Sequence, residues 1–202
     1  MHLSAMQTLV FATANPNKVA EVRLLLGDAY DFRSLRDIGC TEAVPETQPT
    51  LIGNALQKAE YVAKHYGVDC FAEDSGLEVD ALDGLPGVDT AHYAGPERDA
   101  VANMTKLLRA LGDGEQRAAQ FRAVIALVRG DERQTFEGVV RGRIAREMRG
   151  AGGFGYDPIF IPEGEECTFA ELPAGFKKTY SHRSRAMRKL VAFLTDKPAE
   201  AG

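Results

Sequence analysis

Two extended segments follow one another in the middle of the chain, and they constrain the fold more than any other feature. In residues 119–128 apolar side chains recur at every second position, which is typical of a strand. Residues 134–145 alternate less cleanly but also have the character of a strand. Because no helix is predicted between these neighbours, a purely parallel sheet is disfavoured. The sequence therefore predicts an α/β fold in which helices flank a mixed, twisted sheet.

The other segments alternate between strand and helix patterns. The chain is predicted to open with a strand at residues 7–12, a tight turn, and a helix whose apolar residues recur at helical spacing. Further predicted strands lie at residues 70–73, 77–81 and 158–161, and further predicted helices at residues 50–66 and 98–111 and after Ser181. A turn formed by Ser75 and Gly76 is expected to separate two of these strands.

The length and composition are those of one globular domain, predicted to span residues 1–202 with frayed ends at 1–5 and 196–202. The net charge of −5 argues against a nucleic-acid polymer as partner. No long apolar run or signal peptide is evident, so no membrane partner is expected. The cysteines form no zinc or redox pattern and indicate a cytoplasmic protein with reduced thiols: Cys40, Cys70 and Cys167.

The turn after the first strand has the features of an anion site. A turn that leads into a helix presents free backbone N–H groups and the positive end of the helix dipole. Asn15 and Pro16 suit the start of that helix, and Lys18 adds a full positive charge in its first turn. The alternative interpretation is an ordinary helix cap with an exposed lysine. The glycines of a Walker motif are missing.

Two adjacent acids, Glu73 and Asp74, follow an apolar strand segment. Carboxylates in such a place can bind Mg²⁺, which prefers hard oxygen ligands. One of them could also take a proton from a metal-polarised water. Glu46, a few residues before a predicted helix, could supply another carboxylate. The alternative for the acid pair is a surface turn that uses acids for solubility, and the alternative for Glu46 is an ordinary acid in a loop.

Two later segments could bind a flat, polar ligand. Residues 152–158 contain three glycines together with Phe154 and Tyr156, so the backbone can approach a ligand and a ring can stack on it. His182 and Arg183 offer several hydrogen-bond donors at a helix start, which suit a purine with an oxygen at position six. The alternatives are a glycine-rich hairpin loop and a basic helix start.

In combination, these motifs resemble the inosine triphosphate pyrophosphatase family, whose members act on non-standard purine nucleotides. The matching stretches occur in the family's order over nearly the whole chain: residues 13–18, 73–77, 84–88, 152–160 and 181–183. The resemblance implies an Mg²⁺-dependent hydrolase that cuts ITP, dITP and XTP to the monophosphate and pyrophosphate. It also implies an elongated sheet in two lobes with the active cleft between them, and a homodimer.

The resemblance also implies roles for individual residues. Asp74 would be the proton acceptor and a magnesium ligand, Glu46 would be the second ligand, and Ser75 would contact the substrate. The triphosphate would bind to Thr13, Ala14, Asn15, Pro16, Asn17 and Lys18. The nucleotide pocket would be lined by Phe154, Gly155, Tyr156, Asp157, Lys177, His182 and Arg183.

The chain departs from the family pattern at two positions. Many relatives carry an acid where this chain has Gly53, and many have Asp where it has Glu73. An alternative function is a related pyrophosphatase for modified pyrimidine nucleotides, although the Ser-x-Ser-Pro-Arg-Arg run typical of that family is missing. Another alternative is a non-enzymatic nucleotide sensor, which would not need the acid pair.

Overall fold

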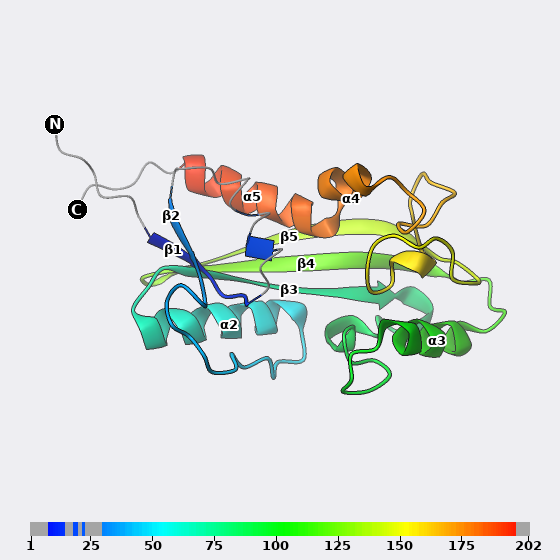
Figure 1. Cartoon of the computed structure of the whole chain (residues 1–202), viewed down its shortest axis with the longest axis horizontal. Coiled ribbons are helices and arrows are strands. Elements are labelled where there is room, and N and C mark those ends of the chain that lie inside the picture. The colour runs from blue at the N-terminus through cyan, green and yellow to red at the C-terminus, as the bar shows by residue number, and fades with distance from the viewer. Residues whose placement is uncertain (1–7, 15–17, 20–21, 23–29, 197–202) are drawn as a thin grey trace. The chain divides into compact units, whose positions relative to one another are not determined.

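The structure is a computed structural model that describes residues 8–14, 18–19, 22 and 30–196. Its centre is a six-stranded sheet with the strand order β2-β1-β3-β4-β5-β6 (Figure 1). The strands are β1 (Thr8–Phe11), β2 (Asp31–Ser34), β3 (Cys70–Val79), β4 (Ala118–Arg129), β5 (Glu132–Ile144) and β6 (Phe160–Pro162). Because β1 pairs in parallel with β2 and β3 while β5 and β6 are antiparallel, the predicted mixed sheet is confirmed.

The helices begin and end where local chemistry favours it. They are α2 (Leu51–Tyr66), α3 (Ala100–Leu111), α4 (Ala174–Tyr180) and α5 (His182–Asp196). The Thr50 side chain accepts a hydrogen bond from the backbone N–H of Gly53 and caps α2, and Gly67 ends this helix in a left-handed conformation. Asp99 caps α3 in the same way. No helix within the described residues is long and apolar enough to span a membrane.

The chain divides into two compact units. Unit 1 comprises residues 1–74, 124–136 and 186–202, and unit 2 comprises residues 75–123 and 137–185. Strands β3, β4 and β5 contribute residues to both units. Each unit has its own apolar core and is described separately below.

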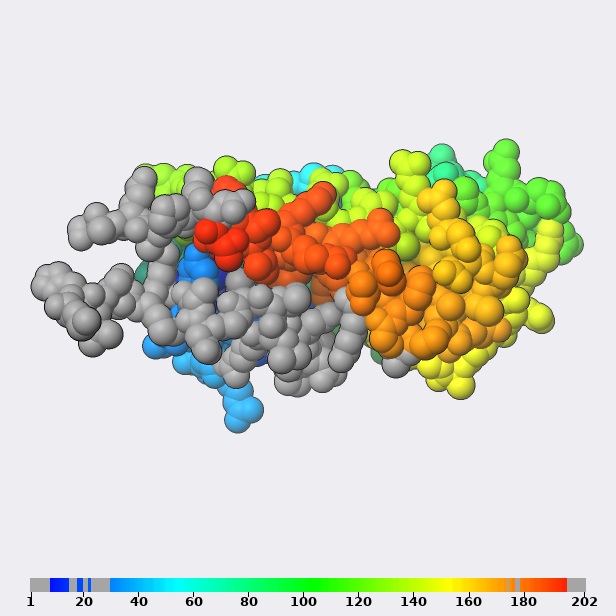
Figure 2. All heavy atoms as spheres, turned by 90° about the horizontal axis from the view of Figure 1, so that it is seen from above, coloured from blue at the N-terminus to red at the C-terminus, as the bar shows by residue number. Residues whose placement is uncertain are grey.

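Unit 1 is built around an aromatic cluster on the first strands. The rings of Phe11 and Phe71 stack with centroids 4.5 Å apart, and Phe32 packs against both. Helix α2 lies on one face of the strands and α5 on the other (Figure 1). Phe193 of α5 packs against Phe136, and the outer side of α5 forms part of the molecular surface in Figure 2.

Unit 2 has an apolar core of its own. It is formed by Leu77, Val79, Met104, Leu107, Leu111, Ala119, Phe121, Val140, Ile144, Tyr156, Ile159, Phe160 and Phe169. The apolar face of α3 contributes three of these side chains. Rings dominate its centre, where Phe121 packs against both Phe160 and Phe169.

The predicted turn at Ser75 and Gly76 is wrong, because β3 runs without a break from Cys70 to Val79. A Cβ at Gly76 would collide with the carbonyl oxygen of Gly87. The glycine therefore permits the close approach of another segment to a continuous strand, where the sequence suggested a turn. Asp74 and Ser75 consequently lie in the middle of β3 and not at a strand end.

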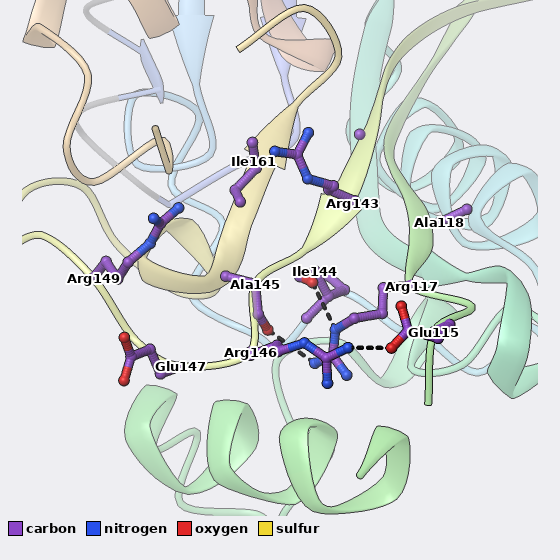
Figure 3. A pocket seen from close by; sticks show the side chains of 11 residues that line it. Glu115, Arg117, Ala118, Arg143, Ile144, Ala145, Arg146, Glu147, Arg149 and Ile161 are labelled. Carbon is purple, nitrogen blue, oxygen red and sulfur yellow. Dashed lines mark hydrogen bonds and ion pairs between the residues drawn. The ribbon is translucent and has the colours of Figure 1, made fainter. Parts of the chain in front are cut away.

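Arg117, just before β4, ties the ends of two strands together in unit 2. Its guanidinium donates to the carbonyl oxygens of Ile144 (2.8 Å), Ala145 (2.9 Å) and Gly112 (3.0 Å). It lines a pocket of about 560 Å³ that also contains Arg143, Arg146 and Arg149 (Figure 3). Since the donors of Arg117 already bind backbone carbonyls, we interpret this residue as structural.

We expect Arg117→Met to lower the free energy of unfolding by about 2–4 kcal/mol, because buried carbonyl oxygens lose their donor. Arg146→Met in the same pocket is the matched control. Arg146 pairs with Glu115, and both side chains are more than half exposed, so this change should cost less than about 1 kcal/mol. Urea denaturation of both variants measures the difference. Equal losses of unfolding free energy in the two variants would show that the hydrogen bonds from Arg117 to carbonyl oxygens stabilise the fold no more than an exposed ion pair does.

Candidate functional site

Unit 1 contains a compact cluster of one lysine and two carboxylates. The Lys58 Nζ lies 3.0 Å from Oε1 of Glu46 and 3.2 Å from Oδ1 of Asp74. Lys58 projects from α2, Asp74 from β3, and Glu46 from the loop before α2. The side chains of Lys58 and Asp74 are largely buried, whereas that of Glu46 is half exposed. The cluster is therefore reached from solvent on the Glu46 side.

Asp74 has the electrostatic environment of a reactive carboxylate. Its Oδ2 is buried and has no hydrogen-bond partner among the described residues. Burial raises the pKa of Asp74 above its ordinary value, and the negative charge of Glu46 adds to this. The charge of Lys58 and its hydrogen bond to Oδ1 act in the opposite direction, as does the nearby amide of Asn54. A buried acceptor atom without a donor is a group that could bind a cation or take a proton.

Lys58 is not among the site residues predicted from the sequence, although its position in α2 carries a signal. Leu51, Ala55, Ala59 and Val62 form the buried stripe of α2. Lys58 falls on this same stripe, three residues after Ala55 and four before Val62. Because a lysine is almost never buried without a partner, its place on an apolar stripe predicts a buried carboxylate nearby.

Lys18, after the first strand, contacts the other member of the acid pair, Glu73. Lys18 Nζ lies 3.5 Å from Oε1 of Glu73, whose side chain is almost fully buried. Lys18 is helical, and Thr13 and Ala14 follow β1. Residues 15–17, part of the predicted phosphate turn, lie outside the described residues. The structure thus brings Lys18 next to Glu73, and phosphate binding by residues 13–18 stays a prediction.

Gly53 supplies no metal ligand, and its surroundings explain why a larger residue does not fit. A Cβ at this position would lie 2.7 Å from the Cβ of Gln48. The backbone N–H of Gln48 is in turn held at 2.8 Å from Oδ1 of Asn54. An acid at position 53 would therefore require the loop before α2 to move.

In unit 2, residues 152–158 form the glycine-aromatic loop, in which one aromatic ring is exposed and the other is buried. Phe154 is 66% exposed, whereas Tyr156 is 3% exposed and belongs to the core. Asp157 shapes the loop, because its Oδ2 accepts a hydrogen bond of 2.8 Å from the backbone N–H of Phe154. Of the two rings that the sequence offered for base stacking, only Phe154 is accessible.

The Ser-His-Arg segment begins α5. Ser181 accepts a hydrogen bond of 3.2 Å from the backbone N–H of Ser184, which confirms it as the helix cap. The His182 ring is buried and stacks on Phe121, with ring centroids 4.9 Å apart and planes 12° apart. Arg183 is partly buried in the first turn. Lys177 lies in α4, but its side chain is outside the described part of the chain.

The fold and these residues define an α/β protein with a buried carboxylate–lysine centre. The model of the Ham1 family matches residues 9–193, so this chain belongs to the Ham1 family, and the resemblance found in the sequence is confirmed. It is 52% identical over 190 residues to a dITP/XTP pyrophosphatase of Porphyromonas gingivalis, covering 94% of this chain and 98% of the relative. It is 49% identical over 187 residues to a dITP/XTP pyrophosphatase of Flavobacterium johnsoniae, covering 93% and 97%.

Solved structures agree with this assignment. The Ham1 protein of Staphylococcus aureus superposes with a TM-score of 0.91 at 38% identity, covering 95% of this chain and all of that one. A HAM1 protein from Coxiella burnetii gives a TM-score of 0.90 at 38% identity, with the same coverage. The α/β fold predicted from the sequence is therefore that of the family.

Proposed function

We propose that this protein is a nucleoside triphosphate pyrophosphatase that hydrolyses ITP, dITP and XTP to the monophosphate and pyrophosphate. The names of relatives at 49–52% identity over nearly the full length support this substrate class. The observation that carries the chemistry is the buried Oδ2 of Asp74, which has no partner among the described residues and lies beside Lys58. Such an oxygen suits a proton acceptor in hydrolysis.

We further propose that Mg²⁺ binds at Glu46 and Asp74. Glu46 and Asp74 both contact the Lys58 ammonium group, so their carboxylates lie close enough together to face one cation, and Lys58 leaves Oδ2 of Asp74 unused. No group of three or more metal-binding side chains occurs among the described residues, but Mg²⁺ needs only one or two carboxylates besides water and phosphate oxygens. When bound, the ion would polarise the attacking water and neutralise phosphate charge.

The residues of the chain have separable tasks in this proposal. Asp74 accepts the proton of the attacking water at Oδ2. Lys58 holds Asp74 in place through its contact at Oδ1, and its charge opposes the effect of burial, which favours the protonated form of the carboxyl. The ionised form of Asp74, which Lys58 favours, is the form that can act as a base and as a ligand.

Lys18 would bind the triphosphate. Its ion pair with Glu73 is 3.5 Å long, which leaves the ammonium able to reach an anion in addition. We expect Lys18→Ala to weaken binding of ITP by about 1.5–3 kcal/mol and to leave binding of inosine almost unchanged. Calorimetric titration with both ligands measures this. Equal losses for ITP and inosine would remove Lys18 from the phosphate site.

The purine would be bound by residues of unit 2. Phe154 provides an exposed ring for stacking, and His182 and Arg183 provide donors for the oxygen at position six. Stacking of the His182 ring on Phe121 limits its rotation, so that its donor has a fixed direction. A fixed donor discriminates between acceptor and donor groups on a base better than a mobile one.

Pyrophosphate release from a panel of nucleotides tests this function against its alternatives. We expect turnover of ITP, dITP and XTP with Mg²⁺ and little turnover of standard or modified pyrimidine triphosphates. Preferential turnover of a modified pyrimidine triphosphate would establish the alternative of a pyrimidine nucleotide pyrophosphatase. Tight binding of nucleotides without turnover would establish a non-enzymatic sensor. A cytoplasmic homodimer remains our prediction, and light scattering after size-exclusion chromatography tests the dimer.

A further inference from the structure

We propose that Thr90 is a positioning residue that fixes two parts of the substrate site to one another within unit 2. One part is the segment Ser75–Leu77 of β3, and the other is the loop that carries Phe154 and Tyr156. Thr90 follows the short 3-10 helix Gly87–Asp89 and is half buried. This inference rests on the proposed function, because it concerns the loop of Phe154, which is assigned there to base stacking, and Ser75, for which the family resemblance implies a substrate contact.

The hydroxyl of Thr90 holds β3. Oγ1 accepts a hydrogen bond of 2.9 Å from the backbone N–H of Leu77 and donates one of 2.6 Å to the carbonyl oxygen of Gly87. Leu77 lies two residues after Ser75 on the same strand. A group that receives and donates at once has a defined orientation, so the hydroxyl fixes the strand relative to the segment of residues 84–90.

The carbonyl oxygen of Thr90 holds the glycine-aromatic loop. It accepts a hydrogen bond of 3.0 Å from the hydroxyl of Tyr156. Because the Tyr156 ring is buried, it cannot stack on a base. Its hydroxyl group instead donates its hydrogen bond to the Thr90 carbonyl oxygen. Phe154, which is exposed, lies two residues earlier in the same loop.

The backbone packing around Thr90 is as close as its hydrogen bonds. Only glycine fits at position 76, since a Cβ there would meet the Gly87 carbonyl and would lie 3.0 Å from Oγ1 of Thr90. Further along the strand, the backbone N–H of Val79 donates to the carbonyl oxygen of Leu85 at 3.1 Å. Residues 84–90 therefore pack along β3 and hold this strand in place, and we call this segment the brace. This gives a structural role to residues 84–88, a family motif that has no role in the proposed reaction.

Steady-state kinetics distinguish the hydrogen bond from Leu77 to the Thr90 hydroxyl from the hydrogen bond between Tyr156 and the Thr90 carbonyl oxygen. We expect Thr90→Val to lower kcat for ITP by about tenfold or more, because small displacements of positioning groups cost turnover. Thr90→Ser keeps the hydroxyl and should retain most of this activity. Tyr156→Phe should instead raise KM by about three- to tenfold with kcat little changed. Thr105→Val is the control, because its hydroxyl bonds only to Val101 within α3 among the contacts described.

A second measurement does not depend on turnover. The Leu77 amide should exchange its hydrogen faster in Thr90→Val than in the wild type or in Thr90→Ser. Unchanged exchange in Thr90→Val would overturn the brace. Faster exchange with wild-type kcat and KM would show that the brace is only structural. A wild type that releases no pyrophosphate from any purine triphosphate would instead overturn the proposed function, and the exchange result would still decide whether the brace exists.

Discussion

Replacing Asp74 with asparagine is expected to lower kcat for ITP hydrolysis by about 10²–10⁴-fold while ITP still binds. An amide cannot accept the proton of the attacking water, and it is a poorer ligand for Mg²⁺ than a carboxylate. The change also removes the negative charge that faces Lys58 at 3.2 Å, but Glu46 remains as a partner of this lysine at 3.0 Å. The buried ammonium group therefore does not lose all of its compensation, and the protein should fold.

Steady-state kinetics and calorimetric binding of ITP measure the two parts of this prediction. Glu60→Gln is the matched control, since Glu60 lies on α2 and, among the contacts described, forms only an ion pair with Arg133 at the surface. It should keep wild-type kcat. An Asp74→Asn protein that keeps more than about a tenth of wild-type kcat would exclude Asp74 as the general base.

The second large effect concerns the choice of base. Hypoxanthine and xanthine carry an acceptor oxygen at position six, whereas adenine carries a donor amine there. Donors that face a donor remain unpaired, and sites built on such hydrogen bonds can reject the wrong ligand by about 10⁴–10⁵-fold. We therefore expect the wild type to prefer ITP and XTP strongly over ATP, and Arg183→Ala to lose much more activity on ITP than on ATP. GTP shares the oxygen at position six, so Arg183 and His182 do not exclude it.

The measurement is kcat/KM for ITP, XTP, GTP and ATP in the wild type and in Arg183→Ala. Arg188→Ala, a change at an exposed position of the same helix, is the control and should leave the ITP-to-ATP ratio unchanged. If Arg183→Ala lowers both rates equally, Arg183 acts on a feature that both substrates share, such as phosphate, and its assignment to base selection is wrong.

Local signals made much of the fold predictable. Thr50 and Gly67 mark the ends of α2 because capping depends on the residue itself and its near neighbours. Strand β4 was predictable because apolar residues recur at every second position, and β5 was predictable from a similar but less regular pattern. The short strand β2 and helix α4 were missed, since too few residues are present to establish a period.

The site was predictable in its residue types but not in its contacts. Gly76 suggested a turn, because glycine is common in turns, and the approach of Gly87 that actually requires it comes from a segment eleven residues away. Lys58 was overlooked because its partners, Glu46 and Asp74, are distant in sequence. Tyr156 and Phe154 look equivalent in the sequence, and only the packing of unit 2 shows that one is buried and the other exposed.

Product analysis of ITP hydrolysis by the purified protein tests the proposed activity most directly. With Mg²⁺, we expect IMP and pyrophosphate in equal amounts, no accumulation of IDP, and loss of turnover when the metal is chelated. The Asp74→Asn protein in the same assay should yield neither product above about a hundredth of the wild-type rate. Formation of IDP and phosphate, or equal turnover in the Asp74→Asn protein, would contradict a pyrophosphatase centred on Asp74.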